Sequence, residues 1–381
     1  MAGIYIHIPF CKQACHYCDF HFSTNLDKQS EMVVGLSAEL ALQRDYLQGE
    51  VVETIYLGGG TPSLLSLREL DSLFQSIHKN YPLHPKAEIT LEANPDDLSK
   101  QKLHDMRSVG INRLSIGIQS FDDKVLASLH RVHNSHLAEK SIEDAYETGF
   151  ENISIDLIYG IPGQDDELWK NNISRALAFK PQHISSYALT VEERTVFGKR
   201  AAQGKFTALD DDNTANQLQL LVEMLSEKNY AQYEVSNFCL PGFMSQHNSN
   251  YWKSKPYLGI GPSAHSYNGS SRQHNVRNNY QYLASIGSAR VPAQIEILSR
   301  EDKINEYLLT SLRTSWGADL NKLRNEFDVD IAATYKQYLK QLLTSELATV
   351  HEDTLVLTRK GKLLADKIAS DLFLLPSQPA R

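Results

Sequence analysis

Three of the four cysteines of this chain, Cys11, Cys15 and Cys18, fall within eight residues. A disulfide explains them poorly because an odd cluster leaves one thiol unpaired, and a closed zinc site normally takes four protein ligands. Three neighbouring thiolates suit an iron–sulfur cube, which ordinarily takes four cysteine ligands. With three, one iron keeps a position for a ligand that is not protein. A chance cluster or an incomplete zinc knuckle is the alternative.

Several later positions could bind the ligand of such a cluster. The run 58–62 (GGGTP) contains three glycines, which let a backbone approach a ligand closely, although a tight turn would explain it equally well. Asp156 lies within an apolar run and Gln119 ends another, so each polar group needs a partner. Arg131 presents a planar fork that matches a carboxylate. Glu92, at an expected strand end, would by itself favour a surface or helix-capping interpretation.

A repeated strand-then-helix pattern is expected to position these residues. Parallel strands need helical crossovers, so six such units predict an α/β fold built on a parallel sheet. Six units rather than eight favour a partial, TIM-like (β/α)6 barrel, and the polar residues then fall at the carboxyl edge where such barrels bind ligands. The expected strands are 4–8, 54–57, 88–92, 113–118, 152–157 and 183–189, and the expected helices are 27–46, 66–80, 97–108, 122–129, 136–148 and 165–177.

The rest of the chain changes character twice. After a polar connection (201–213), a helix (214–227) and a short strand (232–238), the segment 238–261 is dense in aromatic residues, His, Gly and Pro and is predicted to be a loop. The tail is expected to contain helices at 301–312, 319–326, 332–344 and 359–372 and a hairpin at 347–357, which together resemble a winged helix. The predicted domains are therefore a barrel (1–237), an aromatic-rich connection (238–298) and a winged-helix-like, helical C-terminal domain (299–381).

Composition excludes some classes of function. The 381 residues carry a net charge of −8, which argues against broad binding to nucleic acid or anionic membranes and disfavours a winged-helix DNA regulator. The chain has no transmembrane segment of about 18 apolar residues, and its first residues have no basic lead typical of a signal peptide. Clustered free thiols indicate a reducing compartment, so we expect a cytoplasmic protein.

Taken together, these motifs are similar to those of the oxygen-independent coproporphyrinogen III oxidase-like branch of radical S-adenosylmethionine (SAM) proteins. The resemblance covers most of the chain and includes the run 5–11 (YIHIPFC). It implies that Cys11, Cys15 and Cys18 hold a [4Fe-4S] cluster whose open iron binds SAM. It further implies that SAM is contacted by Tyr5, Gly59, Gly60, Thr61, Glu92, Gln119, Arg131 and Asp156, with Tyr17 beside the cluster.

One departure separates the chain from the oxidases of that branch. Their motif resembles Cys-x-x-x-Cys-x-x-Cys-x-Cys, whereas Phe20 stands here in place of the fourth cysteine. The missing thiol weighs against oxidative decarboxylation of coproporphyrinogen III to protoporphyrinogen IX, which stays the rival enzymatic interpretation.

A second departure is the segment 247–252 (HNSNYW), which resembles the HNxxYW motif of the haem-chaperone branch. The resemblance implies a protein that binds haem as cargo and passes it to haem-requiring proteins, with self-association into a homodimer left open. A histidine can ligate haem iron and aromatic rings can pack on a porphyrin, but spacing alone favours a satisfied loop histidine. The implied haem residues are His247, Asn248, Tyr251 and Trp252, with His265, His274 and Cys239 as other candidate iron ligands.

Overall fold

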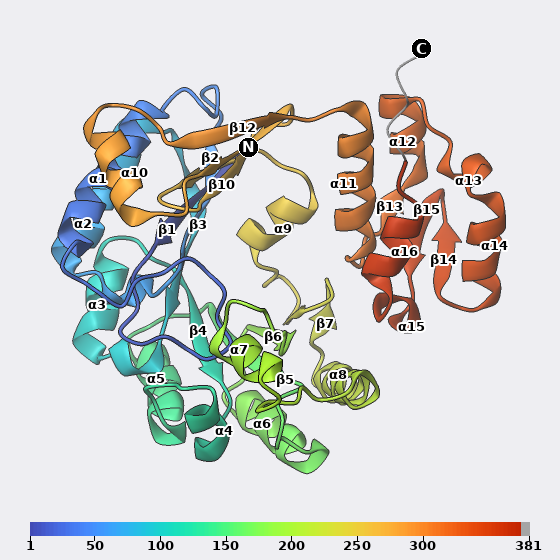
Figure 1. Ribbon diagram of the computed structural model, residues 1–381, viewed down its shortest axis with the longest axis horizontal. Helices are drawn as coiled ribbons and strands as arrows, with labels where there is room; N and C mark the ends of the chain where they lie inside the picture. The colour runs from blue at the N-terminus through green and yellow to red at the C-terminus, as the bar shows by residue number, and fades with distance from the viewer. Residues whose placement is uncertain (375–381) are drawn as a thin grey trace.

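The computed structural model describes residues 1–374 and contains a twelve-stranded sheet and a three-stranded sheet (Figure 1). Strands β1 to β6 are parallel and follow one another in chain order. The sheet is open, and strands from later in the chain extend both of its edges. The predicted α/β class with a partial barrel is confirmed, although the sheet has twelve strands where six parallel strands and one later short strand were expected.

The large sheet comprises β1 (Ala2–Ile8), β2 (Val52–Gly59), β3 (Leu83–Ala93), β4 (Arg113–Gln119), β5 (Ile153–Tyr159), β6 (His183–Ala188), β7 (Ala231–Gln232), β8 (Asn237–Cys239), β9 (Tyr257–Ile260), β10 (His265–Tyr267), β11 (Ser271–Asn275) and β12 (Ala293–Ile297). Its helices are α1 (Gln29–Leu42), α2 (Leu67–Asn80), α3 (Lys100–Ser108), α4 (Asp123–Ser128), α5 (Ser135–Glu147), α6 (Asp166–Ala178), α7 (Val196–Ala202), α8 (Asp211–Ser226), α9 (Gln246–Trp252) and α10 (Asn279–Gly287), with single 3-10 turns η1 (Pro62–Leu64) and η2 (Pro95–Asp97).

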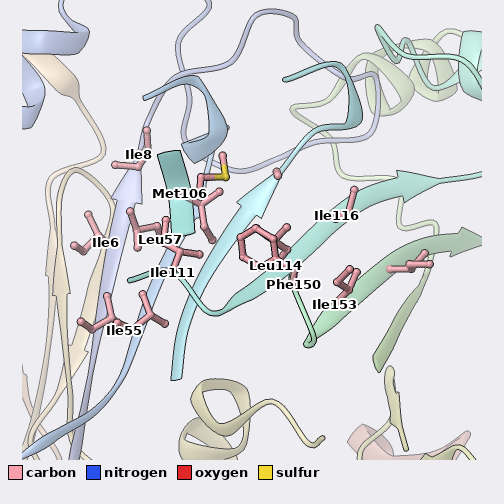
Figure 2. Packing of buried hydrophobic residues seen from close by; sticks show 14 of the residues in the cluster. Ile6, Ile8, Ile55, Leu57, Met106, Ile111, Leu114, Ile116, Phe150 and Ile153 are labelled. Atoms are coloured by element: carbon pink, nitrogen blue, oxygen red, sulfur yellow. The ribbon is translucent and has the colours of Figure 1, made fainter. Parts of the chain in front are cut away.

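The six parallel strands alternate in chemical character. One set of side chains is apolar and packs beneath the outer helices, as Ile6, Ile55 and Leu114 do with Met106 of α3 (Figure 2). The intervening side chains face the concave side and include many polar groups, such as Glu92 on β3. Successive strand residues point to opposite faces, so this alternation gives the sheet an apolar outer face and a polar inner face.

The loop prediction for 238–261 is wrong over much of its length. Residues 246–252 form α9, and 257–260 form β9, which pairs in parallel with β1. Helix α9 is seven residues long and rich in poor helix formers, so its own propensity predicts it weakly. Its first turn is held by the Ser245 side chain and by Glu88 of β3, which accepts from the backbone N–H groups of residues 246 and 247. That tertiary contact explains the error.

The C-terminal module has a hydrophobic core of its own. The hairpin predicted at 347–357 is present, and it turns at Glu352 and Asp353, both in the left-handed region. A third strand, β13, was not predicted, and two of the expected helices are each interrupted; residues 375–381 lie outside the described part. The elements are α11 (Arg300–Leu312), β13 (Ala318–Asp319), α12 (Leu320–Phe327), α13 (Ile331–Thr334), α14 (Lys336–Thr344), β14 (Ala348–His351), β15 (Thr354–Leu357), α15 (Arg359–Lys362) and α16 (Ala365–Asp371).

Helix α9 lies between the sheet and this module (Figure 1). At its C-terminal end, the guanidinium of Arg313, directly after α11, lies 5.6 Å from the Trp252 ring, and the Lys253 ammonium lies 5.1 Å from the Trp316 ring. The motif residues therefore contact both halves of the molecule. Over residues 1–374, every helix is too short or too polar to cross a lipid bilayer.

A buried carboxylate ties the added edge strands to the first helix. Glu39 of α1 is fully buried and accepts four hydrogen bonds. The donors are Gln43 Nε2 (2.8 Å), Asn275 Nδ2 (2.7 Å), the Gly261 N–H (2.8 Å) and the Tyr282 hydroxyl (2.6 Å). Because these donors come from the residue that follows α1, from β11, from the turn after β9 and from α10, one side chain fixes the packing of all four segments.

We expect Glu39→Ala to destabilise the protein by about 3 kcal/mol, since it leaves several buried donors without an acceptor. Thermal unfolding of the full chain should show a melting temperature lower by about 5 °C. The matched control is Glu31→Ala on the exposed face of the same helix, which should change little. Equal melting temperatures for the two variants would contradict this role for Glu39.

Candidate functional site

The cysteine loop, residues 9–28, joins β1 to α1 without a helix or strand of its own. Its shape comes from contacts with other segments. The Cys11 N–H donates to Ser23 O at 3.0 Å and closes the loop on itself. The Lys12 ammonium lies 2.9 Å from the Asp96 carboxylate in η2, which fixes the loop against the end of β3.

The far side of the loop is held by three more segments. His16 Nδ1 lies 3.0 Å from Ser128 O at the end of α4, and the Phe197 N–H of α7 donates to His16 O at 3.0 Å. Arg277, between β11 and α10, donates to Asp19 O. The positions of the three cysteines are therefore set by residues spread over most of the chain.

All three cysteines line one cavity of about 530 Å³ at the carboxyl edge of the parallel strands. Twelve of the sixteen predicted site residues reach it, whereas Tyr5, His247, Tyr251 and Trp252 are not among its lining residues. The twelve are Cys11, Cys15, Tyr17, Cys18, Gly59, Gly60, Thr61, Glu92, Gln119, Arg131, Asp156 and Asn248.

The donor set of this cavity fits a cluster better than a single ion. Within residues 1–374, no three His, Cys, Asp or Glu side chains converge on a point that one metal ion could occupy. A cubane does not need such convergence, because each thiolate binds a different iron. Cys239, the remaining cysteine, is buried in β8 and is absent from the cavity lining. Burial raises the pKa of the Cys11 thiol to about 12 and that of Cys18 to about 11.

The glycines of the run 58–62, at the C-terminal end of β2, are required by packing against β1. Gly59 has φ +101°, and a Cβ there would lie 2.3 Å from His7 Nδ1. At Gly60, a Cβ would lie 2.6 Å from both Ile8 O and Phe10 O. Glycine thus allows the end of β2 to sit against the base of the cysteine loop. From the sequence, these glycines were expected to let the backbone approach a ligand closely. The turn that they form also lines the cavity.

Two carboxylates from different strands face the cavity. Glu92 accepts from the Tyr56 hydroxyl (2.8 Å) and from the Gly59 N–H (3.1 Å). Asp156 accepts from Ser115 Oγ at 3.0 and 3.1 Å. Burial raises the pKa of Glu92 to about 7 and that of Asp156 to about 6, with the neighbouring Asp156 charge adding to the shift at Glu92. Burial thus favours the protonated form of both groups, and a cationic, donor-rich ligand would favour the ionised form that accepts its hydrogen bonds.

Gln119 is the last residue of β4, and Arg131 lies in the segment that follows α4. Gln119 has φ +67°, a left-handed conformation that is uncommon for a residue with a side chain and is often found at functional sites. Arg131 donates from Nη2 to Asn94 Oδ1 (2.6 Å) and to Gly117 O (2.9 Å), and its Nη1 lies 3.4 Å from Cys15 Sγ. A permanent positive charge thus lies beside the cysteines.

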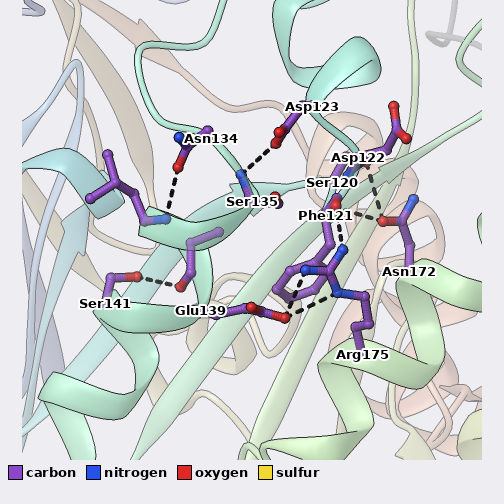
Figure 3. Close-up of polar contacts among 12 residues, drawn as sticks. Ser120, Phe121, Asp122, Asp123, Asn134, Ser135, Glu139, Ser141, Asn172 and Arg175 are labelled. Carbon is purple, nitrogen blue, oxygen red and sulfur yellow. Dashed lines mark hydrogen bonds and ion pairs between the residues drawn. The ribbon is translucent and has the colours of Figure 1, made fainter.

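A polar network outside the cavity holds this segment in place (Figure 3). Asn172 of α6 accepts from the Phe121 N–H at 2.7 Å, and Arg175 donates to Phe121 O at 2.5 Å. Arg175 also pairs with Glu139 of α5 at 2.7 Å. Two helices therefore fix the backbone directly after Gln119.

The HNxxYW segment forms α9 and lies under the cavity. His247 is 1% exposed, and both ring nitrogens have partners: Nδ1 lies 2.8 Å from Thr54 Oγ1, and Nε2 lies 2.8 Å from the Tyr251 hydroxyl. In this conformation His247 is not free to ligate iron. It has the arrangement that spacing alone favoured, a histidine whose hydrogen bonds are satisfied among aromatic rings. Asn248 alone among the motif residues named for haem lines the cavity.

The other candidate iron ligands differ in accessibility. Cys239 is 3% exposed, whereas His265 and His274 are exposed and face each other across β10 and β11, with ring centroids 5.5 Å apart. Phe20, at the position of the fourth cysteine of the oxidases, lines the cavity and is 71% exposed. An aromatic side chain therefore stands at the cavity mouth where those enzymes have a thiol.

Sequence reasoning missed several polar residues of this site, among them Tyr56, Asn94 and Ser115. Tyr56 lies in the middle of β2 and points into the cavity, and strand alternation from Gly58 could have identified it. Asn94 bridges Arg131 and Thr61, whose Oγ1 lies 3.2 Å from Asn94 Nδ2. Its only signal was its place two residues after Glu92, at the end of β3.

Comparisons with known proteins agree with this architecture. Residues 5–175 match the radical SAM superfamily, and residues 298–364 match the HemN C-terminal domain. The structure of coproporphyrinogen III oxidase (HemN) from Escherichia coli aligns with a TM-score of 0.84 at 24% identity, covering 98% of this chain and 90% of that one. That likeness shows the fold.

Curated relatives extend over nearly the whole chain. The heme chaperone HemW of Mycobacterium tuberculosis is 36% identical over 97% of this chain and 94% of its own length, and that of Bacillus subtilis is 34% identical over 97% and 98%. The radical SAM family implies SAM and a [4Fe-4S] cluster. The chain therefore belongs to the HemW family of the radical SAM superfamily.

Proposed function

We propose that this protein is a cytoplasmic haem chaperone that binds haem and transfers it to haem-requiring proteins. The names of the HemW relatives support haem as the cargo. The observation that carries the cofactor part of the proposal is the single cavity in which three cysteines meet Glu92, Arg131 and Asp156. A reducing compartment suits its free thiols.

In this proposal, Cys11, Cys15 and Cys18 hold the [4Fe-4S] cluster and the cavity residues above hold SAM. A cluster held there would be able to supply an electron to SAM, which is the chemistry that the competing oxidase assignment requires. The chain's own residues provide charge complementarity: Arg131 is placed for the SAM carboxylate, while Glu92 and Asp156 accept from its amine and hydroxyl donors. Gln119, with its strained backbone, adds a polar contact on the same rim.

The proposal does not require His247 as the iron ligand. Its ring would have to exchange a protein partner for iron, whereas His265 and His274 are exposed as they stand. Asn248 and Trp252 remain the motif residues best placed for contact with cargo, since Asn248 lines the cavity and Trp252 is half-buried.

SAM acts in this proposal as a regulatory ligand that alters haem affinity or self-association. A ligand shifts an equilibrium only when it binds the two states with different affinity. We expect SAM to change the mass of the cluster-loaded protein in solution, or its affinity for haem. Analytical ultracentrifugation and haem titration, each with and without SAM, measure these quantities, and identical values in both would reject the regulatory role.

For the cluster, we expect anaerobically reconstituted protein to contain about four irons and four acid-labile sulfides per chain. Cys15→Ser should lose most of this iron, because one of the three thiolate ligands is removed. Cys239→Ser is the matched control and should retain it, since that thiol is buried in β8. Zinc in the wild-type protein, or full iron retention by Cys15→Ser, would contradict the assignment.

For the cargo, we expect cluster-loaded protein to bind haem and to pass it to a haem-free acceptor such as apomyoglobin. The transfer is followed by the change in the haem absorption spectrum as the acceptor fills. The competing enzymatic assignment is tested in the same preparation with reductant, SAM and coproporphyrinogen III. Formation of protoporphyrinogen IX together with no haem transfer would overturn the chaperone proposal.

A further inference from the structure

Helix α9 closes the concave face of the sheet directly below the cofactor cavity. Glu88 of β3 accepts the backbone N–H of Gln246 and of His247 at 3.0 Å each, which fixes the start of the helix to the sheet. A Cβ on Gly3 of β1 would lie 3.3 Å from the His247 ring. Asn248, the next residue, lines the cavity itself. The helix is therefore the floor of the site.

The His247 imidazole is locked on this floor. Its two nitrogens bond to Thr54 of β2 and Tyr251 of α9, and its ring stacks on Tyr56 with centroids 5.2 Å apart and planes 28° apart. Burial, and the nearby Arg113 charge, lower the pKa of His247 to about 3. A neutral ring is expected here, because a protonated one would place a second buried cation close to Arg113.

Tyr56 connects this ring to the cavity. Its hydroxyl donates to Glu92 Oε1 at 2.8 Å, while the Gly59 N–H donates to Oε2 at 3.1 Å. The aromatic ring of Tyr56 thus rests on His247 while its hydroxyl orients the carboxylate. Loss of the imidazole would leave Tyr56 free to tilt away from Glu92.

We propose that His247 is a positioning residue of the SAM site, which holds Tyr56 so that Tyr56 can hold the Glu92 carboxylate. The inference rests on the proposed role of Glu92 in binding SAM. This role is consistent with the burial of His247 and with the hydrogen bonds that both of its ring nitrogens make. The motif then belongs to the floor of the cofactor site, and iron ligation by His247 is not needed.

The pH dependence of SAM binding reports this arrangement. The pKa of Glu92, about 7 in the unliganded protein, is raised by burial and by Asp156 and lowered by the hydrogen bonds from Tyr56 and Gly59. An ionised carboxylate is the stronger acceptor, so affinity should rise as pH increases through this value. Removing or misplacing the Tyr56 hydroxyl raises the pKa of Glu92 further and moves the midpoint to higher pH. The other titratable groups near Glu92 are the phenols of Tyr5, Tyr187 and Tyr251.

The experiment measures SAM affinity by equilibrium dialysis across pH 5.5–8.5 on the full-length, cluster-reconstituted protein, beside haem affinity. The variants are His247→Gln, Tyr56→Phe and their combination, with His78→Ala on the outer helix α2 as an exposed-histidine control. We expect each single variant to weaken SAM binding about tenfold at pH 7 and to shift the midpoint upward. The double variant should be little worse than Tyr56→Phe alone, because both changes act through Glu92. Haem affinity of His247→Gln should stay near the wild-type value.

Other outcomes reject the inference. Wild-type SAM affinity and midpoint in His247→Gln, or effects that simply add in the double variant, would show that His247 does not act through Tyr56. Loss of haem binding with unchanged SAM binding would assign it to the iron. If His247→Gln does not fold, Thr54→Val removes one hydrogen bond of the ring, and an unchanged pH midpoint there is equally decisive. A wild-type protein that binds no SAM rejects the proposed function as well, which distinguishes the two failures.

Discussion

The structure depends on the alternation within its six parallel strands. Parallel sheets covered on both faces by helices usually have nearly continuous apolar strands. Here every second side chain is directed toward a concave face that carries Glu88, Glu92, Asp156 and other polar groups. Such groups need partners, because burying a polar group without a hydrogen bond is unfavourable. Helix α9 satisfies the lower part of this face, and the upper part is left as the cofactor cavity.

The cysteine loop illustrates the same dependence on tertiary contacts. It has no regular structure, yet it is bonded to η2, α4, α7 and the segment before α10. These anchors come from positions up to Arg277. A loop fixed at so many points can present three thiols at the mouth of the cavity without a helix or strand to carry them. The Arg131 guanidinium then adds a fixed positive charge beside Cys15.

Much of this arrangement could be predicted from local sequence. Strand–helix alternation predicted the parallel sheet, and the polar residues at strand ends predicted a common rim, where Glu92, Gln119 and Asp156 do line one cavity. Periodicity could not reveal α9, whose first turn is stabilised by a carboxylate 158 residues earlier in the chain. For the same reason, spacing could not decide whether His247 was accessible; its partners are Thr54 and a stacked Tyr56 from β2. The left-handed backbone of Gln119 likewise has no local sequence signal.

The central claim is that the open iron of a three-cysteine cluster and SAM share the upper part of the concave face. The most direct measurement is the electron paramagnetic resonance spectrum of the reduced cluster, recorded before and after SAM is added. The account predicts that the signal changes on addition of SAM, because SAM becomes a ligand of the unique iron. A [4Fe-4S] signal that stays the same at saturating SAM would contradict it.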